Sequence, residues 1–146
     1  GYRRRVISYT LADTSASTLT LADSGSMIQV IGGGGYDDII DLPLIAAVDT
    51  GWWCEFYVVT ALGGSDSLKI RINGHADAAD GFHLILQNNA TPTQTVWTAG
   101  SDILTIAASS PVSTYVKLTN VQGGAAEKWI AECFQPSGTS IAVASS

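Results

Sequence analysis

Hydrophobic and polar positions along the chain follow the pattern of short β-strands. Runs of β-branched and aromatic residues recur about every ten residues, and stretches rich in Gly, Ser, Asn, Asp and Pro separate them. Helical spacing of apolar residues is almost absent. We therefore predict strands over residues 6–11, 18–21, 27–31, 39–42, 52–60, 68–72, 82–87, 96–98, 103–107, 115–120, 129–134 and 141–144.

Two of these segments indicate how the strands are arranged. Residues 52–60 form the longest run and are apolar on both faces apart from Glu55, which predicts a central strand covered on both sides. Residues 68–72 alternate, so their three apolar side chains should face inward, and the following Asn73-Gly74 pair suits a tight hairpin. The predicted fold is all-β: an antiparallel, jelly-roll-like β-sandwich without substantial helix.

Composition adds an expectation about the surface. A chain of 146 residues is long enough for one domain that folds without disulfides or metal. Apolar residues make up 46% and charged residues 14%, against a usual charged share of about 25%. This low charge density predicts that another molecule covers part of the surface. We divide the chain into a basic N-terminal arm, residues 1–5, and a single β-sandwich domain, residues 6–146, with a C-terminal edge strand or tail.

Charge is distributed unevenly. The net charge is −6, yet three of the seven basic residues are Arg3, Arg4 and Arg5. The rest of the chain has four basic and thirteen acidic residues. A basic arm thus precedes an acidic body. Such an arm can bind nucleic acid, an anionic membrane or an acidic protein surface, whereas the body would be repelled by the first two. An unpaired, solvated terminus is the other interpretation, and both stay open.

The four consecutive glycines Gly32, Gly33, Gly34 and Gly35 lie between two predicted strands. A dinucleotide-binding loop would need a further glycine and a helix after it, but two aspartates follow and would repel phosphate. We interpret the run as a conformable loop that frays in solution or lies against a neighbouring chain. On that interpretation, bulky replacements should weaken binding and leave the fold intact.

Catalytic and metal-binding motifs are not found in the sequence. No serine stands in a G-x-S-x-G motif, and the spacing of carboxylates, histidines and cysteines matches neither an EF-hand nor a zinc site. We expect no enzymatic activity, metal or cofactor, while a weak calcium site at residues 75–81 and converging carboxylates stay open. The residues considered are Asp37, Asp38, Asp41, Asp77, Asp80, Glu55, Glu127 and Glu132, with His75 and His83 interpreted as structural or surface residues and Cys54 and Cys133 as buried free thiols.

Four tryptophans allow two interpretations. Exposed on one face of a sandwich, they would form a platform for sugar rings. Alternatively, Trp53 and Trp129 belong to the core, while Trp52 and Trp97 cover a subunit interface, where tryptophan is enriched. We favour the interface and keep the sugar platform as the alternative role of Trp52 and Trp97.

The order of several short motifs resembles a known group of proteins. The chain contains L-T-L-A-D-S-G at 19–25, I-D-L-P at 40–43, G-W-W-C-E-F-Y-V at 51–58 and W-I-A-E at 129–132 before a Gly/Ser-rich tail. In this order, with a glycine-rich loop between the first two, these elements resemble accessory virion proteins of tailed bacteriophages, and above all capsid decoration (cement) proteins.

That resemblance implies a non-enzymatic virion structural protein. It would be made in the host cytoplasm, bind the outer surface of the phage head as a homotrimer, and stabilise contacts between major capsid proteins, with a second accessory capsid protein as a further partner. We expect Arg3 to Arg5 and Gly32 to Gly35 to contact the capsid, and no nucleic acid or membrane partner. Related modules occur in head fibres and tail appendages, so a carbohydrate- or receptor-binding module of a fibre or tail is the alternative.

Overall fold

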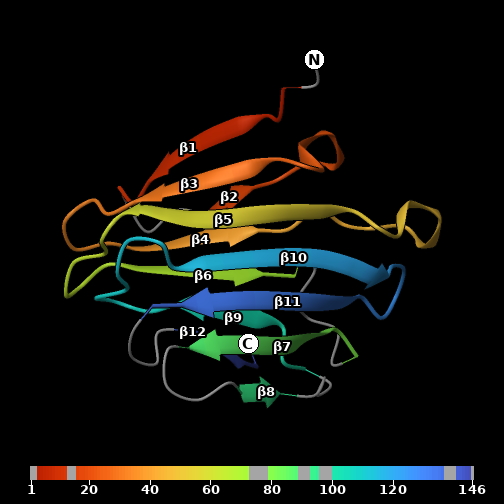
Figure 1. Cartoon of the computed structure of the whole chain (residues 1–146). Coiled ribbons are helices and arrows are strands. Elements are labelled where there is room, and N and C mark those ends of the chain that lie inside the picture. Colours follow the sequence, from red (N-terminus) through yellow and green to blue (C-terminus); the bar gives the residue numbers. More distant parts are fainter. Residues whose placement is uncertain are drawn as a thin grey trace.

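The computed structural model describes residues 3–12, 16–72, 79–88, 93–95, 100–136 and 141–145. Two β-sheets pack face to face in a sandwich, with the larger sheet in front in Figure 1. In the described residues, helix is limited to the short 3₁₀ turns η1 (Leu21–Asp23) and η2 (Ala47–Asp49), and no helix there is long and apolar enough to span a membrane. The seven-stranded sheet has the order β1 (Val6–Thr10), β3 (Met27–Ile31), β5 (Trp53–Thr60), β10 (Tyr115–Gln122), β11 (Lys128–Gln135), β7 (Gly81–Asn88) and β8 (Thr93–Thr95). The five-stranded sheet has the order β12 (Ile141–Ala144), β9 (Ile103–Ile106), β6 (Ser67–Arg71), β4 (Asp37–Asp41) and β2 (Ala16–Thr18).

The first six strands wind as a coil around the core. Successive strands alternate between the two sheets, so β1, β3 and β5 lie side by side in one sheet and β2, β4 and β6 in the other (Figure 1). Each strand pairs in parallel with the strand two places along the chain. Because the chain crosses to the other sheet before it returns, it re-enters each sheet in the same direction.

The remaining strands close the sandwich by antiparallel pairing and one parallel pair. The β10–β11 hairpin lies between β5 and β7; β10 is antiparallel to both its neighbours, while β11 is parallel to β7. In the other sheet, β9 pairs antiparallel with β6 and β12. The predicted β-sandwich without substantial helix is confirmed, but its sheets are mixed, and a coil of parallel strands replaces the antiparallel Greek keys of a jelly roll.

Alternating side chains fill the space between the sheets. The inner faces contribute Phe56, Phe82 and Trp129, all fully buried, together with the predicted inward residues of β6 and the residue after it. The predicted 73–74 hairpin lies outside the described residues; β6 and β7, the strands on either side of it, belong to different sheets. The inward residues of this segment are Leu68, Ile70 and Ile72.

Strand bounds differ from the prediction in a few places. The strand predicted at 18–21 lies at 16–18 instead, and residue 21 begins the first 3₁₀ turn. The strand predicted at 96–98 falls outside the described residues, whereas β8 precedes it. The C-terminal strand β12 is the edge of its sheet and pairs with β9 of the same chain.

Candidate functional site

The outer face of the seven-stranded sheet carries most of the sandwich's half-exposed aromatic residues. Strand alternation turns one set of side chains to the core and the other set outward. The backbone register places Tyr57 of β5, Tyr115 of β10 and Phe134 of β11 next to one another in a single row across the sheet. Trp53 lies on the same face of β5, two rows away, beyond the row of Glu55 and Lys117. We call this surface the outer face.

The two adjacent tryptophans have opposite roles to those predicted. Trp52 is only 4% exposed and contacts Trp129 edge-to-face, with ring centroids 5.6 Å apart. Its indole N–H donates to the carbonyls of Thr20 and Leu21. Trp53 instead points outward, since side chains alternate along β5 and the next residue, Cys54, points into the core. Trp52 is therefore not an interface or sugar platform, Trp129 is confirmed as core, and Trp97 lies outside the described residues.

The basic arm lies against the body at one end of the outer face. Arg3, Arg4 and Arg5 line a hollow of about 470 Å³ together with Trp53 and residues 22 and 24–26. We call it the arginine hollow. Arg5 forms an ion pair with Asp23, yet its side chain keeps 59% of its exposure. The arm thus presents cationic groups to solvent from a fixed position.

Arg4 anchors this hollow to the centre of the sheet. Its guanidinium forms an ion pair with Glu55, donates to the Gly25 carbonyl at 3.0 Å, and lies 5.1 Å from the ring centroid of Trp53. The Tyr115 hydroxyl donates to the other carboxylate oxygen of Glu55 at 2.6 Å. Burial, followed by the bond to Glu55, raises the pKa of Tyr115 well above its usual value, so the phenol stays a donor. Lys117 approaches the same Trp53 ring at 5.4 Å.

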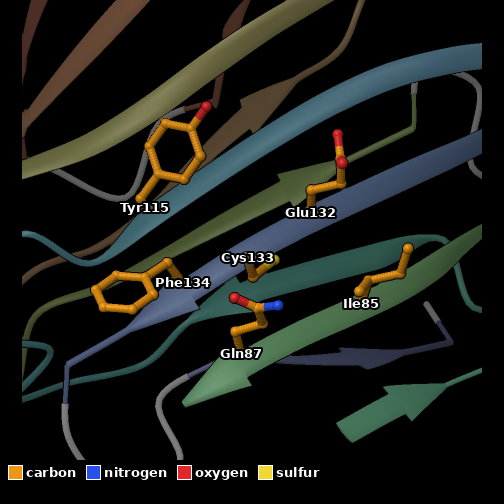
Figure 2. A pocket seen from close by; sticks show the side chains of 6 residues that line it. All are labelled: Ile85, Gln87, Tyr115, Glu132, Cys133 and Phe134. Carbon is orange, nitrogen blue, oxygen red and sulfur yellow. The ribbon is translucent and has the colours of Figure 1, made fainter. Parts of the chain in front are cut away.

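A second hollow of about 230 Å³ lies over β7, β10 and β11 (Figure 2). Its floor is the backbone at Cys133, whose side chain is buried. Figure 2 shows the Tyr115 and Phe134 rings on one side of this floor and Ile85 on the opposite side. We call it the aromatic hollow; its full lining is Ile85, Gln87, Tyr115, Glu132, Cys133 and Phe134.

The glycine run forms a cradle for a carboxylate of the same chain. The backbone N–H groups of Gly34, Gly35, Tyr36 and Gly63 all donate to the side chain of Asp66, each within 3.1 Å. Gly34 and Gly35 have positive φ angles of 99° and 114°, a conformation that turns successive N–H groups toward one anion. Asp66 is 1% exposed, and these bonds lower its pKa to about 2. The carboxylate fills the site that a phosphate would take in a binding loop.

The expectation that bulky residues at the glycine run leave the fold intact is wrong, since Gly34 and Gly35 have positive φ angles that strain residues with side chains, and Gly32 and Gly33 have no room for one. A Cβ atom on Gly33 would stand 1.4 Å from the Leu11 carbonyl oxygen, and one on Gly32 would stand 2.6 Å from that of Ala61. Backbone packs directly against these two positions, so side chains cannot enter without moving it. The run is built into the fold, and its contact with a capsid stays a prediction.

The structure does not bring the two predicted capsid-binding segments together. Arg5 immediately precedes β1, and Gly32 immediately follows β3, which is parallel to β1. The arm and the glycine run therefore lie at opposite ends of these strands, roughly 17 Å apart along a five-residue strand. A single flat contact would have to span that length.

The other candidate residues have structural partners. Asp41 pairs with Arg71 through two hydrogen bonds, Asp38 accepts from Tyr9, and Asp37 accepts from Ser67. In the part of the chain that the structure describes, no three His, Cys, Asp or Glu side chains converge as a metal site. Both cysteines, Cys54 and Cys133, are buried and free, as predicted, and burial raises the pKa of each thiol. His83 lies half-buried on β7, while His75 and Asp77 lie outside the described residues.

The three glutamates do not converge. Glu55 and Glu132 lie in one row of the outer face with Lys117 between them. Glu127 is buried elsewhere, accepting from the Ile45 backbone and the Trp129 indole, and burial raises its pKa. It fastens a loop to the core.

A comparison with protein-family models and with curated proteins finds no match to this chain. Asp66, the aromatic hollow and the outward direction of Trp53 were not predicted from the sequence. The alternation along β5 could have predicted that Trp53 points outward, because Cys54 and Phe56 occupy the inward positions of this strand. The hollow had no local signal in the sequence, since β7 is distant in the chain from the β10–β11 hairpin that completes it.

Proposed function

We propose that this protein is a non-enzymatic virion structural protein that decorates the outer surface of a phage head. It binds as a homotrimer and bridges neighbouring major capsid proteins. The observation that supports this best is the arginine hollow, where three basic side chains and Trp53 form a fixed docking surface on an otherwise acidic body. The low share of charged residues and the half-buried Trp53 beside the arginines fit a protein whose surface is covered at this end.

The chemistry of the hollow defines the capsid surface that it fits. Arg5 is largely exposed, and Arg4 keeps a 33% exposed side chain despite its pairing. Arginine binds carboxylates through two parallel hydrogen bonds, and Trp53 offers an apolar surface beside them. The matching partner is an acidic segment of the major capsid protein. Each contact alone is modest, and three contacts in a trimer multiply the affinity through effective concentration.

Co-sedimentation with phage heads stripped of accessory proteins tests the proposal. The intact chain should bind saturably, and Arg3→Ala combined with Arg5→Ala should weaken binding at least about tenfold, since each substitution removes an exposed charge worth about 1 kcal/mol. Arg4 is left in place because it supports Glu55 and Trp53. Lys69→Ala is the control: it removes a positive charge from the five-stranded sheet. Light scattering of the free and released protein measures the oligomer.

Two results would contradict the proposal. One is the absence of saturable binding to heads at any salt concentration. The other is equal binding by the arginine variant and the Lys69→Ala control, which would leave the arginine hollow without a role in docking. A carbohydrate- or receptor-binding role in a fibre or tail appendage is the alternative function, and with Trp52 in the core it would need another platform.

A further inference from the structure

We propose that the aromatic hollow binds a single neutral sugar ring, which stacks on Phe134 and Tyr115 and hydrogen-bonds to Glu132 and Gln87. This inference goes beyond docking on a capsid and does not depend on it. The arginine hollow lies around the beginnings of β1, β3 and β5, whereas the aromatic hollow lies over β7, β10 and β11. One site can therefore be occupied while the other is engaged.

The register of three strands builds the hollow. Tyr115, Phe134 and Gln87 are direct neighbours in one row, and Glu132 and Ile85 are neighbours in the next. All five side chains stand on the outer face, around the backbone at residue 133 (Figure 2). β11 is paired along its length on both sides, so this floor is rigid.

Two aromatic rings, those of Tyr115 and Phe134, form one side of the hollow. Phe134 is 47% exposed, which leaves an aromatic face open to solvent in the free protein. The Tyr115 ring is fixed, because its hydroxyl donates to Glu55, which Arg4 holds in turn. The C–H groups on one face of a pyranose are apolar and slightly positive, and the face of an aromatic ring is slightly negative, so the two stack.

Polar groups stand where a stacked ring would present its hydroxyls. Glu132 and Gln87 are both exposed and lie on either side of the floor in Figure 2. A carboxylate accepts hydrogen bonds from hydroxyls, and an amide both donates and accepts, so together they match a polyol that does both. A few placed polar groups beside an apolar wall are the usual composition of a ligand site.

Size and charge select among ligands. The hollow, about 230 Å³, is smaller than the roughly 300–1,000 Å³ of sites for drug-sized molecules, so it fits one ring. Glu132 would repel phosphates and acidic sugars. A cage for an organic cation places rings around the charge, whereas Tyr115 and Phe134 lie in one row on the same side.

NMR titration of the ¹⁵N-labelled chain with methyl glycosides of glucose, galactose, mannose and N-acetylglucosamine tests the site. At least one glycoside should shift the backbone amides of residues 85, 87, 115, 132 and 134 saturably. Phe134→Ala should raise the Kd about tenfold, the upper range of an aromatic contact, and Phe134→Tyr should restore binding. Tyr36→Ala is the control, because Tyr36 is a 41% exposed aromatic residue outside the hollow.

Three outcomes would overturn the inference. The first is that none of the four glycosides shifts these amides saturably. The second is that Phe134→Ala, with its thermal unfolding unchanged, binds as tightly as the original chain. The third is that tetramethylammonium binds at these residues and the glycosides do not, which would identify the hollow as a cation site. Head binding is measured separately, so its failure would leave this result unaffected.

Discussion

At the scale of single residues, Asp66 explains why the chain has four glycines in a row. A buried carboxylate is costly unless hydrogen bonds replace its water. Here four backbone N–H groups donate to the carboxylate in place of water. Three of them come from the consecutive residues 34–36, whose conformation requires glycine at positions 34 and 35. Gly32 and Gly33 serve a second purpose, because they let the backbone pass close to Ala61 and Leu11. The run is thus a joint between two loops of the same molecule.

Gly33→Ala should destabilise the protein strongly. Its Cβ atom would overlap the Leu11 carbonyl, and relieving the overlap should cost about 3 kcal/mol or more of unfolding free energy. Gly64→Ala, in the same pair of loops, is the matched control, since its Cβ would meet no atom within 4 Å. We expect it to be neutral or stabilising by about 0.4–1 kcal/mol. Urea denaturation measures both, and equal stability of the two variants would contradict the close approach.

Asp66 should make stability depend on pH in a defined window. Its pKa falls from 3.8 in the unfolded chain to about 2 in the fold, so its stabilisation is complete above about pH 4 and is lost as pH falls through 2. Asp66→Asn should therefore cost about 2 kcal/mol at pH 7, a charge-assisted contribution, and much less near pH 2. Thermal unfolding across this range measures the difference. If the stability difference between the original chain and Asp66→Asn stays constant with pH, the ionised carboxylate is not its cause. Asp49→Asn is the control, because Asp49 is exposed.

At the scale of elements, the sequence predicted where strands lie better than how they pair. Apolar alternation marks a strand in either direction, so residues 27–31 and 103–107 were located without any information about their partners. Parallel pairing in the first six strands follows from crossing between sheets at each turn, and no local motif records that crossing. The antiparallel expectation failed for this reason.

The same distinction applies to the candidate site. The clustering of Arg3, Arg4 and Arg5 needs only their adjacency in sequence, so it could be predicted. Tyr115 and Gln87 line the same hollow because each strand pairs with β11, an arrangement that depends on tertiary register. Trp52 and Trp53 show the cost of a one-residue error, because a shift by one position along a strand exchanges core and surface.

At the scale of the whole molecule, the two sheets have different outer surfaces. The seven-stranded sheet presents the aromatic row, the arginine hollow and the aromatic hollow. The five-stranded sheet presents mainly Lys69, Arg71 and short polar side chains beside Asp41 and Ile39. Both proposed binding sites therefore lie on the seven-stranded sheet.

The position of β11 also sets an order in time. Residues 89–127 separate β7 from β11, so in a chain being synthesised β7 has only the three-residue β8 beside it until residues 128–135 emerge. The coil of β1 to β6 can close earlier, because each of its pairings needs only the strand two places along.

Pulse-labelled hydrogen exchange during refolding should show β3–β5 amides protected before β7–β11 amides, and simultaneous protection would contradict this order. Until β11 arrives, the edges of β7 and β10 that it covers stay open to other chains, so aggregation should compete most strongly at that stage of synthesis.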